Sequence, residues 1–387
     1  MSAENFYEGR EQTKIKHFIL REYLERFALI VQSFANSITY IDCISGPWNL
    51  QSQDFQDSSF AIAIDQLKRA KATLAEKGKQ LALRCMFLEK DPQAFAKLET
   101  FIRQVQGVET KTKNESLERS TPDILTFVRD GGRGTFPFIF IDPTGWTGFA
   151  MDLIAPLLRL HPGEVLINFM TDYIRRFVDH PDQQTQQSFA DLFGSGEFKD
   201  RLQGLDDRQD REDALLQAYA ANVKLTGGYS HSCAATVLYP GVDRTFFHLI
   251  YATRNRKGVE VFKDVERRAM KLMEQTRAEA KQRARIQKSN QPELFPAEEM
   301  PQSRPIDHLR HRNLATAERR VLEELKSRNR LPYEDAWDLA LAFPLVWESD
   351  VKAWIEAWRR AGTLRIEGLK PRQRVPKLKS KHVLALE

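Results

Sequence analysis

Apolar positions in the first half of the chain alternate between two spacings. From Thr13 to Phe34 they recur every three or four residues, which predicts an amphipathic helix. From Ile38 they continue as a short unbroken run, which is typical of a buried strand. The expected elements are helices 13–34, 59–77, 92–104, 122–129 and 149–160, and strands 38–44, 83–89, 107–115, 136–141 and 165–170. Strands that alternate with helices predict a parallel sheet covered by helices on both faces.

Two more apolar runs, 232–239 and 245–253, follow a mostly polar and helical region at 172–225. Too few residues separate them for a parallel crossover, so we expect an antiparallel hairpin. Five parallel βα units closed by an antiparallel hairpin form the sheet of class I methyltransferases, which have a Rossmann-like α/β fold. We expect 172–225 to be a helical insertion or a cap on this domain.

In the last third of the chain, the alternation of strands and helices gives way to a mainly helical pattern. An amphipathic helix over 259–288 ends in a basic stretch, and a segment with four prolines follows it at 289–305. Three helices and a basic two-stranded hairpin come next, a pattern typical of a winged-helix module. The expected elements are helices 316–326, 334–342 and 349–361 and strands 363–367 and 381–387. The expected organisation is a methyltransferase-like domain at 1–275, a basic helix end and proline-rich linker at 276–305, and a winged-helix-like domain at 306–387.

Composition adds a few constraints. The 387 residues are 42% hydrophobic and 29% charged, which is typical of a soluble globular protein, and the net charge of +5 is mildly basic. The polar N-terminus and the lack of an apolar run of about 20 residues argue against a signal peptide and a membrane span, so we expect a cytoplasmic protein. The three cysteines, Cys43, Cys85 and Cys233, lack metal-ligand spacing. We therefore expect reduced thiols, no disulfide framework and no metal site.

Acidic residues lie at the ends of three expected strands. Asp42 lies near the end of the first, Glu89 and Asp91 end the second, and Asp142 ends the fourth. In open α/β sheets, ligands bind at the carboxyl ends of the strands. We therefore expect these side chains to outline one site. The alternative is that Asp42 and Glu89 are solvated strand ends.

The first two strands have the features of a nucleoside site. A carboxylate at the end of the second strand, here Glu89 or Asp91, can bind ribose hydroxyls. After the first strand, Gly46 and Pro47 form a turn that a cofactor can approach closely. This turn contains one glycine, where such turns usually contain several.

The segment from Asp142 to Trp146 predicts an acceptor site. A carboxylate beside a backbone carbonyl, at Asp142 and Pro143, can accept hydrogen bonds from an exocyclic amine. This holds the nitrogen lone pair toward a methyl donor, and Trp146 can stack on a flipped base. The alternative is a turn that ends a strand, with Trp146 in the core.

Basic residues dominate the expected C-terminal hairpin. The stretch 368–387 has six Lys and Arg residues and one acid, Glu387. Such a bias favours contacts with phosphates, although runs of charge are often only solvated faces. The six residues are Lys370, Arg372, Arg374, Lys377, Lys379 and Lys381.

Four segments carry a family resemblance. They are Tyr40-Ile-Asp-Cys-Ile-Ser-Gly-Pro47, Phe140-Ile-Asp-Pro-Thr-Gly-Trp-Thr-Gly-Phe149, Leu166-Ile-Asn-Phe-Met-Thr-Asp-Tyr-Ile174 and Phe247-His-Leu-Ile-Tyr-Ala-Thr253. Together they resemble the three-Cys-motif partner family across about 10–275. The resemblance implies a bacterial protein with a methyltransferase-like fold and a three-Cys-motif protein, encoded nearby, as its partner. The cysteines in the family's name belong to that partner.

One departure from the family and one more distant similarity bear on function. Family members commonly have Asp-Gly-Phe-Ala-Gly after the first strand, where this chain has Cys43, Ile44 and Ser45, so its hold on a cofactor is expected to be weaker. The run 142–145 resembles the Asp-Pro-Phe-Gly motif of tRNA guanine-N2 dimethyltransferases with one substitution. That similarity favours an exocyclic amine as the methyl acceptor.

These features lead to one hypothesis and two alternatives. We expect an S-adenosylmethionine-dependent methyltransferase that acts on an exocyclic amine of a nucleic-acid base, DNA or RNA, with the C-terminal module positioning the substrate. The alternatives are a non-catalytic scaffold for the three-Cys-motif protein and a winged-helix DNA-binding regulator. In the main hypothesis, the cofactor contacts three groups of residues: its methionine part contacts Asp42, Gly46 and Pro47, its ribose contacts Glu89 or Asp91, and its adenine lies near Asn114 or Glu115. The acceptor contacts Asp142, Pro143, Gly145 and Trp146.

Overall fold

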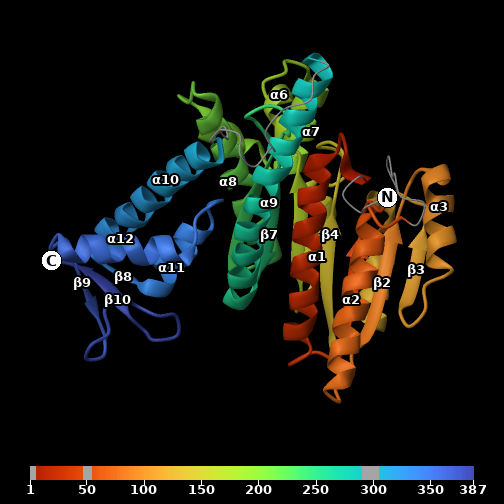
Figure 1. Ribbon diagram of the computed structural model, residues 1–387, viewed down its shortest axis with the longest axis horizontal. Coiled ribbons are helices and arrows are strands. Elements are labelled where there is room, and N and C mark those ends of the chain that lie inside the picture. The colour runs from red at the N-terminus through yellow and green to blue at the C-terminus, as the bar shows by residue number, and fades with distance from the viewer. Residues whose placement is uncertain (1–5, 47–54, 290–304) are drawn as a thin grey trace. The chain divides into compact units, whose positions relative to one another are not determined.

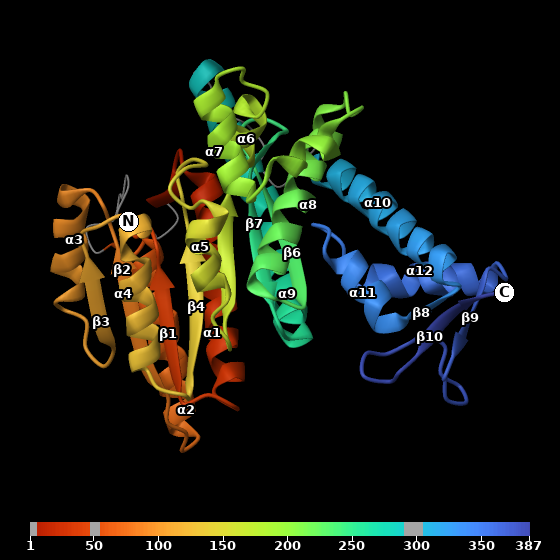
Figure 2. The same cartoon turned by 180° about the vertical axis from the view of Figure 1, so that it is seen from behind.

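The computed structural model describes residues 6–46, 55–289 and 305–387. Pro47 and nearly all of the expected proline-rich linker lie outside these ranges. The chain divides into two compact units, of which the second contains residues 301–387. Both are drawn in Figure 1 and Figure 2.

The large unit is built on a seven-stranded sheet with the order β3-β2-β1-β4-β5-β7-β6. Its first five strands pair in parallel, and β7 pairs antiparallel with β5. The strands are β1 Ser37–Asp42, β2 Ala82–Leu88, β3 Glu109–Lys113, β4 Thr135–Ile141, β5 Glu164–Phe169, β6 His231–Leu238 and β7 Thr245–Thr253. The expectation of five parallel strands followed by an antiparallel hairpin is confirmed.

Helices cover both faces of this sheet. Helices α1, α2 and α9 lie on the face seen in Figure 1, and α4, α5 and α8 lie on the face seen in Figure 2. Every residue of β1 and of β4 is buried, which requires a cover on each side. The helices are α1 Glu11–Val31, α2 Ser59–Glu76, α3 Pro92–Ile102, α4 Leu117–Asp130, α5 Met151–Leu158, α8 Arg208–Gly227 and α9 Arg256–Ser289.

Helix α1 is fixed against the middle of the sheet by aromatic packing and a buried hydrogen bond. Phe27 packs on Phe138 of β4, with ring centroids 5.2 Å apart. Tyr23 donates a hydrogen bond from its hydroxyl to Glu164 at 2.7 Å, at the start of β5. These contacts set the position of the helix, so its first turns lie above the carboxyl ends of the central strands.

The region expected as an insertion or a cap, 172–225, is helical. It contains α6 Thr171–Phe177, α7 Gln183–Phe193, a 3₁₀ helix at Gly196–Leu202 and most of α8. Helix α8 packs beside α5 and belongs to the helical layer. Helices α6 and α7 lie at the carboxyl ends of the strands, at the top of Figure 1 and Figure 2.

The C-terminal unit has three helices and a three-stranded antiparallel sheet with the order β8-β10-β9. The expected helix 316–326 is longer than its pattern suggested, because Ile306, Ala317, Val321 and Leu325 continue one buried stripe. Strand β8 was not expected, since three residues are too few for a pattern. The elements are α10 Pro305–Arg328, β8 Arg330–Pro332, α11 Tyr333–Leu341, α12 Glu348–Arg360, β9 Leu364–Glu367 and β10 Val383–Leu386.

Cys43, Cys85 and Cys233 are buried and not joined by a disulfide bond. Within residues 6–46, 55–289 and 305–387, no helix combines the length and the hydropathy that crossing a membrane requires.

Candidate functional site

The order of the strands places a crevice between β1 and β4. After β1 the chain adds β2 and then β3 on one side, whereas β4 and β5 extend the sheet on the other side. Such a switch point is where open α/β sheets bind ligands, outside the carboxyl ends of the strands. A cavity of about 400 Å³ opens here, between the start of α1 and the segments that follow β1, β4 and β5.

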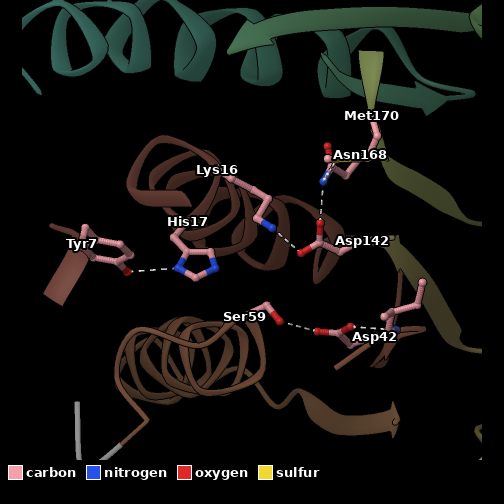
Figure 3. A network of polar contacts seen from close by, with 9 residues as sticks. Tyr7, Lys16, His17, Asp42, Ser59, Asp142, Asn168 and Met170 are labelled. Carbon is pink, nitrogen blue, oxygen red and sulfur yellow. Dashed lines mark hydrogen bonds and ion pairs between the residues drawn. The ribbon is translucent and has the colours of Figure 1, made fainter. Parts of the chain in front are cut away.

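A network of three polar side chains forms one wall of the cavity (Figure 3). Lys16 of α1 forms an ion pair with Asp142 Oδ2, and Asn168 of β5 donates from Nδ2 to Asp142 Oδ1 at 2.7 Å. Both oxygens of Asp142 therefore have partners within the chain. The amide oxygen of Asn168 is buried and has no hydrogen-bond partner among the described residues.

Asp42 lies beneath the cavity floor. Its carboxylate is fully buried, accepts a hydrogen bond from Ser59 Oγ at 2.8 Å and accepts a longer one from the Ile44 amide at 3.3 Å. Burial raises the pKa of Asp42 to about 7; the hydrogen bond from Ser59 opposes the increase, and the charge of Asp142 adds to it. Ser59 lines the cavity and Asp42 does not. Asp42 therefore affects the cavity by orienting the hydroxyl of Ser59.

Glu89 lies at the carboxyl end of β2 and is 1% exposed. Its Oε1 accepts a hydrogen bond from the Asp91 amide at 2.7 Å. Its Oε2 is buried and finds no partner in the part of the chain that the structure describes. Burial raises the pKa of this carboxyl. Glu89 is therefore not a solvated strand end, and one of its two buried oxygens has no hydrogen-bond partner among the described residues.

The neighbours of Glu89 mainly support the backbone. Asp91 caps α3 by accepting a hydrogen bond from the Ala94 amide at 2.8 Å. Asn114 donates to the carbonyl of Glu89 at 2.8 Å and so links the end of β3 to the end of β2. Glu115 accepts a hydrogen bond from the amide of Ser116. Of these carboxylates, Glu89 has a buried oxygen without a hydrogen-bond partner among the described residues.

Trp146 lies beside the cavity rather than in its wall. Its ring packs on Phe177 of α6 and on Phe189 of α7, with centroid distances of 5.0 and 5.3 Å. Its indole Nε1 donates to Ser188 at 2.9 Å. Trp146 joins α6 and α7 to the segment after β4, while Gly145 precedes it in that segment and does not line the cavity.

Two buried side chains of the N-terminal segment also reach the cavity region. His17 lines the cavity, and its Nδ1 lies 3.0 Å from the hydroxyl of Tyr7. Burial lowers the pKa of His17 well below its usual range and raises the pKa of Tyr7 to about 12. Both side chains are therefore uncharged at neutral pH. Arg10 forms an ion pair with Asp57 and so ties this segment to the turn before α2.

The six basic residues expected on the C-terminal hairpin lie in the connection between β9 and β10, in the second unit. The side chains of all six are exposed. His382, which follows them, is buried and accepts a hydrogen bond from the Lys377 amide at 2.9 Å. The backbone of this connection is thus held in place while its charges remain in solvent.

The sequence-based site is partly reassembled in the structure. Gly46, Asp142 and Pro143 line the cavity, Asp42 lies beneath it, and Glu89 ends the neighbouring strand. Sequence reasoning missed Lys16, His17, Ser59 and Asn168. Of these, Asn168 alone carried a signal, because it is a polar residue inside the apolar run 165–169.

No family model and no curated protein matches the chain. Some solved structures are similar to it at low identity. An O-methyltransferase from Bacillus cereus in complex with SAH is 15% identical, with 60% of this chain and 80% of that chain covered and a TM-score of 0.30. The protein LPL1258 from Legionella pneumophila is 11% identical, with coverages of 65% and 86% and a TM-score of 0.34. Loganic acid methyltransferase with SAH is 7% identical, with coverages of 75% and 92% and a TM-score of 0.29.

Proposed function

We propose that the large unit is an S-adenosylmethionine-dependent methyltransferase. The observation that carries the proposal is the cavity at the switch point between β1 and β4. Asp142, after β4, lies in its wall, and Glu89 lies at the end of β2, the strand beside β1. In the proposal, Glu89 binds the ribose and Asp142 the methyl acceptor, on opposite sides of the crevice between β1 and β4.

The residues present fit this cofactor. The unused Oε2 of Glu89 is a buried acceptor, and a ribose hydroxyl would satisfy it, whereas a buried carboxylate oxygen without a partner is costly. Helix α2 begins at Ser59 in the cavity wall, and the positive end of a helix dipole favours the carboxylate of the methionine part. When bound, S-adenosylmethionine supplies an electrophilic methyl group.

The chain's own residues would then hold the acceptor. In the proposed role, Asp142 and the carbonyl of Pro143 accept hydrogen bonds from an exocyclic amine, which directs its lone pair toward the methyl group. Each oxygen of Asp142 already accepts one hydrogen bond or ion pair from the chain, so the amine would use a second lone pair of one oxygen or replace Lys16 or Asn168 as a donor. Catalysis would come mainly from this alignment.

The proposal extends to nucleic acid as the substrate class. The second unit runs α10-β8-α11-α12-β9-β10, which is the order of elements in a winged-helix module, and the basic connection between β9 and β10 takes the place of the wing. Six exposed cations in one loop favour phosphate contacts. A three-Cys-motif protein remains the proposed partner because of the family resemblance.

A second candidate function is a non-catalytic scaffold. The observation that favours it is the ion pair of Lys16 with Asp142, which fills the acceptor side of the cavity from within the chain. The turn after β1 with its single glycine agrees with it. In this case the fold would serve to bind the partner protein.

Calorimetry separates the two functions. S-adenosylmethionine and S-adenosylhomocysteine are titrated into the purified full chain, into Glu89→Gln and into Glu118→Gln, an exposed control on α4. The proposal expects binding that the control keeps and that Glu89→Gln weakens about tenfold or more, since a charged hydrogen bond is worth roughly 1.5–3 kcal/mol. If the folded protein binds neither compound, the scaffold function replaces the enzyme.

A further inference from the structure

A second cluster of charge lies next to the cavity, on α6 and on the turn between β6 and β7. Its centre is Asp172, which is fully buried. Arg175 and Arg176 form ion pairs with its carboxylate, the latter at 2.7 Å, and Arg244 approaches it at 3.3 Å. Asp172, Arg175, Arg176 and Arg244 are called the arginine cluster below.

The arginine cluster has an excess of positive charge. One carboxylate balances one guanidinium, so two of the three positive charges have no counterpart within the cluster. The nearest acid on the turn, Asp243, is itself paired with Arg277 and Lys281 and does not offset them. The excess charge lies at the surface, because the side chains of Arg176 and Arg244 are 49% and 38% exposed.

One hydrogen-bond donor of the arginine cluster is unused. Arg175 is 8% exposed, and its Nε is buried with no acceptor among the residues described here. Because Asp172 holds the three guanidiniums in place, little side-chain freedom remains to be lost when an anion binds. A guanidinium pairs with phosphate through two parallel hydrogen bonds, so this cluster is chemically suited to phosphate groups.

Aromatic rings connect the arginine cluster to the cavity. The guanidinium of Arg176 lies over the ring of Tyr173, 4.8 Å from its centroid, and that of Arg244 lies over Tyr239 at 4.6 Å. Tyr239 in turn packs edge-on against Phe246 at 4.5 Å. Tyr173 and Phe246 both line the cavity. Positive charges and aromatic faces thus alternate from the surface to the cavity wall.

We propose that the arginine cluster binds backbone phosphates of a single-stranded nucleic acid beside the nucleotide whose base enters the cavity. Surfaces that bind single strands combine cationic side chains for the backbone with aromatic faces for the bases, and both are present here. The proposal rests on the proposed function for the identity of the base-binding cavity. The phosphate contact itself is made by Arg176 and Arg244 and needs no cofactor.

The test uses the full chain and two labelled probes, a single-stranded RNA and a DNA of the same sequence, each of about 12 nucleotides. Binding is followed by fluorescence anisotropy between about 50 and 200 mM salt. The variant is Arg176→Gln with Arg244→Gln, which leaves Asp172 paired with Arg175. The matched control is Arg103→Gln with Arg119→Gln, two arginines that are 74% and 78% exposed elsewhere on the same unit.

The variant should bind at least one probe about tenfold more weakly at the lower salt concentrations, and its salt slope should fall by about 1.4, or 0.7 for each lost phosphate contact. The control should bind as the wild type does. The same loss should occur when the C-terminal loop already carries Arg372→Gln with Arg374→Gln. Unchanged affinity and slope for both probes would overturn the proposal.

Calorimetry with S-adenosylmethionine separates this proposal from the proposed function. If the variant keeps the wild-type cofactor affinity and loses the probes, both stand. If the wild type binds the probes through these arginines but no cofactor, the methyltransferase function fails and the arginine cluster remains.

Discussion

Lys16, on the first helix, and Asp142, at the end of the fourth strand, form an ion pair although 126 positions separate them in the sequence. The pair lies at the switch point of the sheet, and both side chains are largely buried, at 12% and 13% exposure. A methyl acceptor that binds Asp142, as we propose, would therefore meet a carboxylate that Lys16 already holds in place.

The ion pair should stabilise the fold more than a surface pair does. A double-mutant cycle with Lys16→Met and Asp142→Asn should give a coupling energy of roughly 1–3 kcal/mol, since removing one partner leaves a mostly buried charge. Urea unfolding of the four proteins measures it. The matched control is Arg69 with Asp65 on α2, 66% and 52% exposed, for which less than about 1 kcal/mol is expected. Equal couplings for the two pairs would contradict this prediction.

Loss of the Asp142 carboxylate should separate catalysis from cofactor binding. Asp142→Ala should lower methyl transfer to nucleic acid by about 100-fold or more, because the amine loses its alignment, while affinity for S-adenosylmethionine stays nearly unchanged. Transfer of a radiolabelled methyl group measures the first quantity and calorimetry the second. Turnover equal to the wild type would reject the role of Asp142.

The buried carboxyl of Asp42 should make stability depend on pH. Its pKa rises from an ordinary 3.8 to about 7 on folding, so between these values the folded chain holds a proton that the unfolded chain has released. The resulting stabilisation is complete below pH 3.8 and is lost as pH rises toward 7. At 1.36 kcal/mol for each pKa unit, the loss is at most about 4 kcal/mol.

Asp42→Asn removes this titration. As pH rises from about 4 to 7, the unfolding free energy of the wild type should therefore fall relative to that of Asp42→Asn. Above pH 7 the difference between the two proteins should stay constant. Urea titrations across this range measure it. Glu212, whose pKa burial also raises to about 7, titrates in both proteins and cancels in the comparison. Parallel curves for the two proteins would refute the assignment.

The loop between β9 and β10 should contribute to nucleic-acid affinity without sequence preference. Replacing Lys370, Arg372 and Arg374 with Gln should weaken duplex DNA binding and reduce its salt slope by about 2.7, or 0.9 for each phosphate contact. Anisotropy at several salt concentrations measures both. The control replaces three exposed cations of the large unit: Arg69, Lys97 and Arg103. An unaltered slope would show that this loop is only a solvated face.

The layout of the sheet could be predicted from the local sequence, because strands buried on both faces appear as unbroken apolar runs, as in β4, and acidic residues mark the strand ends. The contacts that define the cavity could not be predicted in this way. Lys16 lies on an ordinary amphipathic helix, and no feature of the neighbouring sequence indicates that its partner is Asp142, the residue after β4. Trp146 shows the reverse case. Its position after the strand is clear from the sequence, but its packing on Phe177 and Phe189 depends on how α6 and α7 fold back.

The hydrogen bond between Tyr23 and Glu164 gives α1 a second point of attachment, about two helical turns from Lys16. A helix held at two points cannot rotate about either one, so the orientation of α1 on the sheet is fixed. The distance of the Lys16 ammonium from the strand ends is therefore set by the core and not by the loops around it. We therefore expect changes in the length or composition of those loops to leave the two charges aligned.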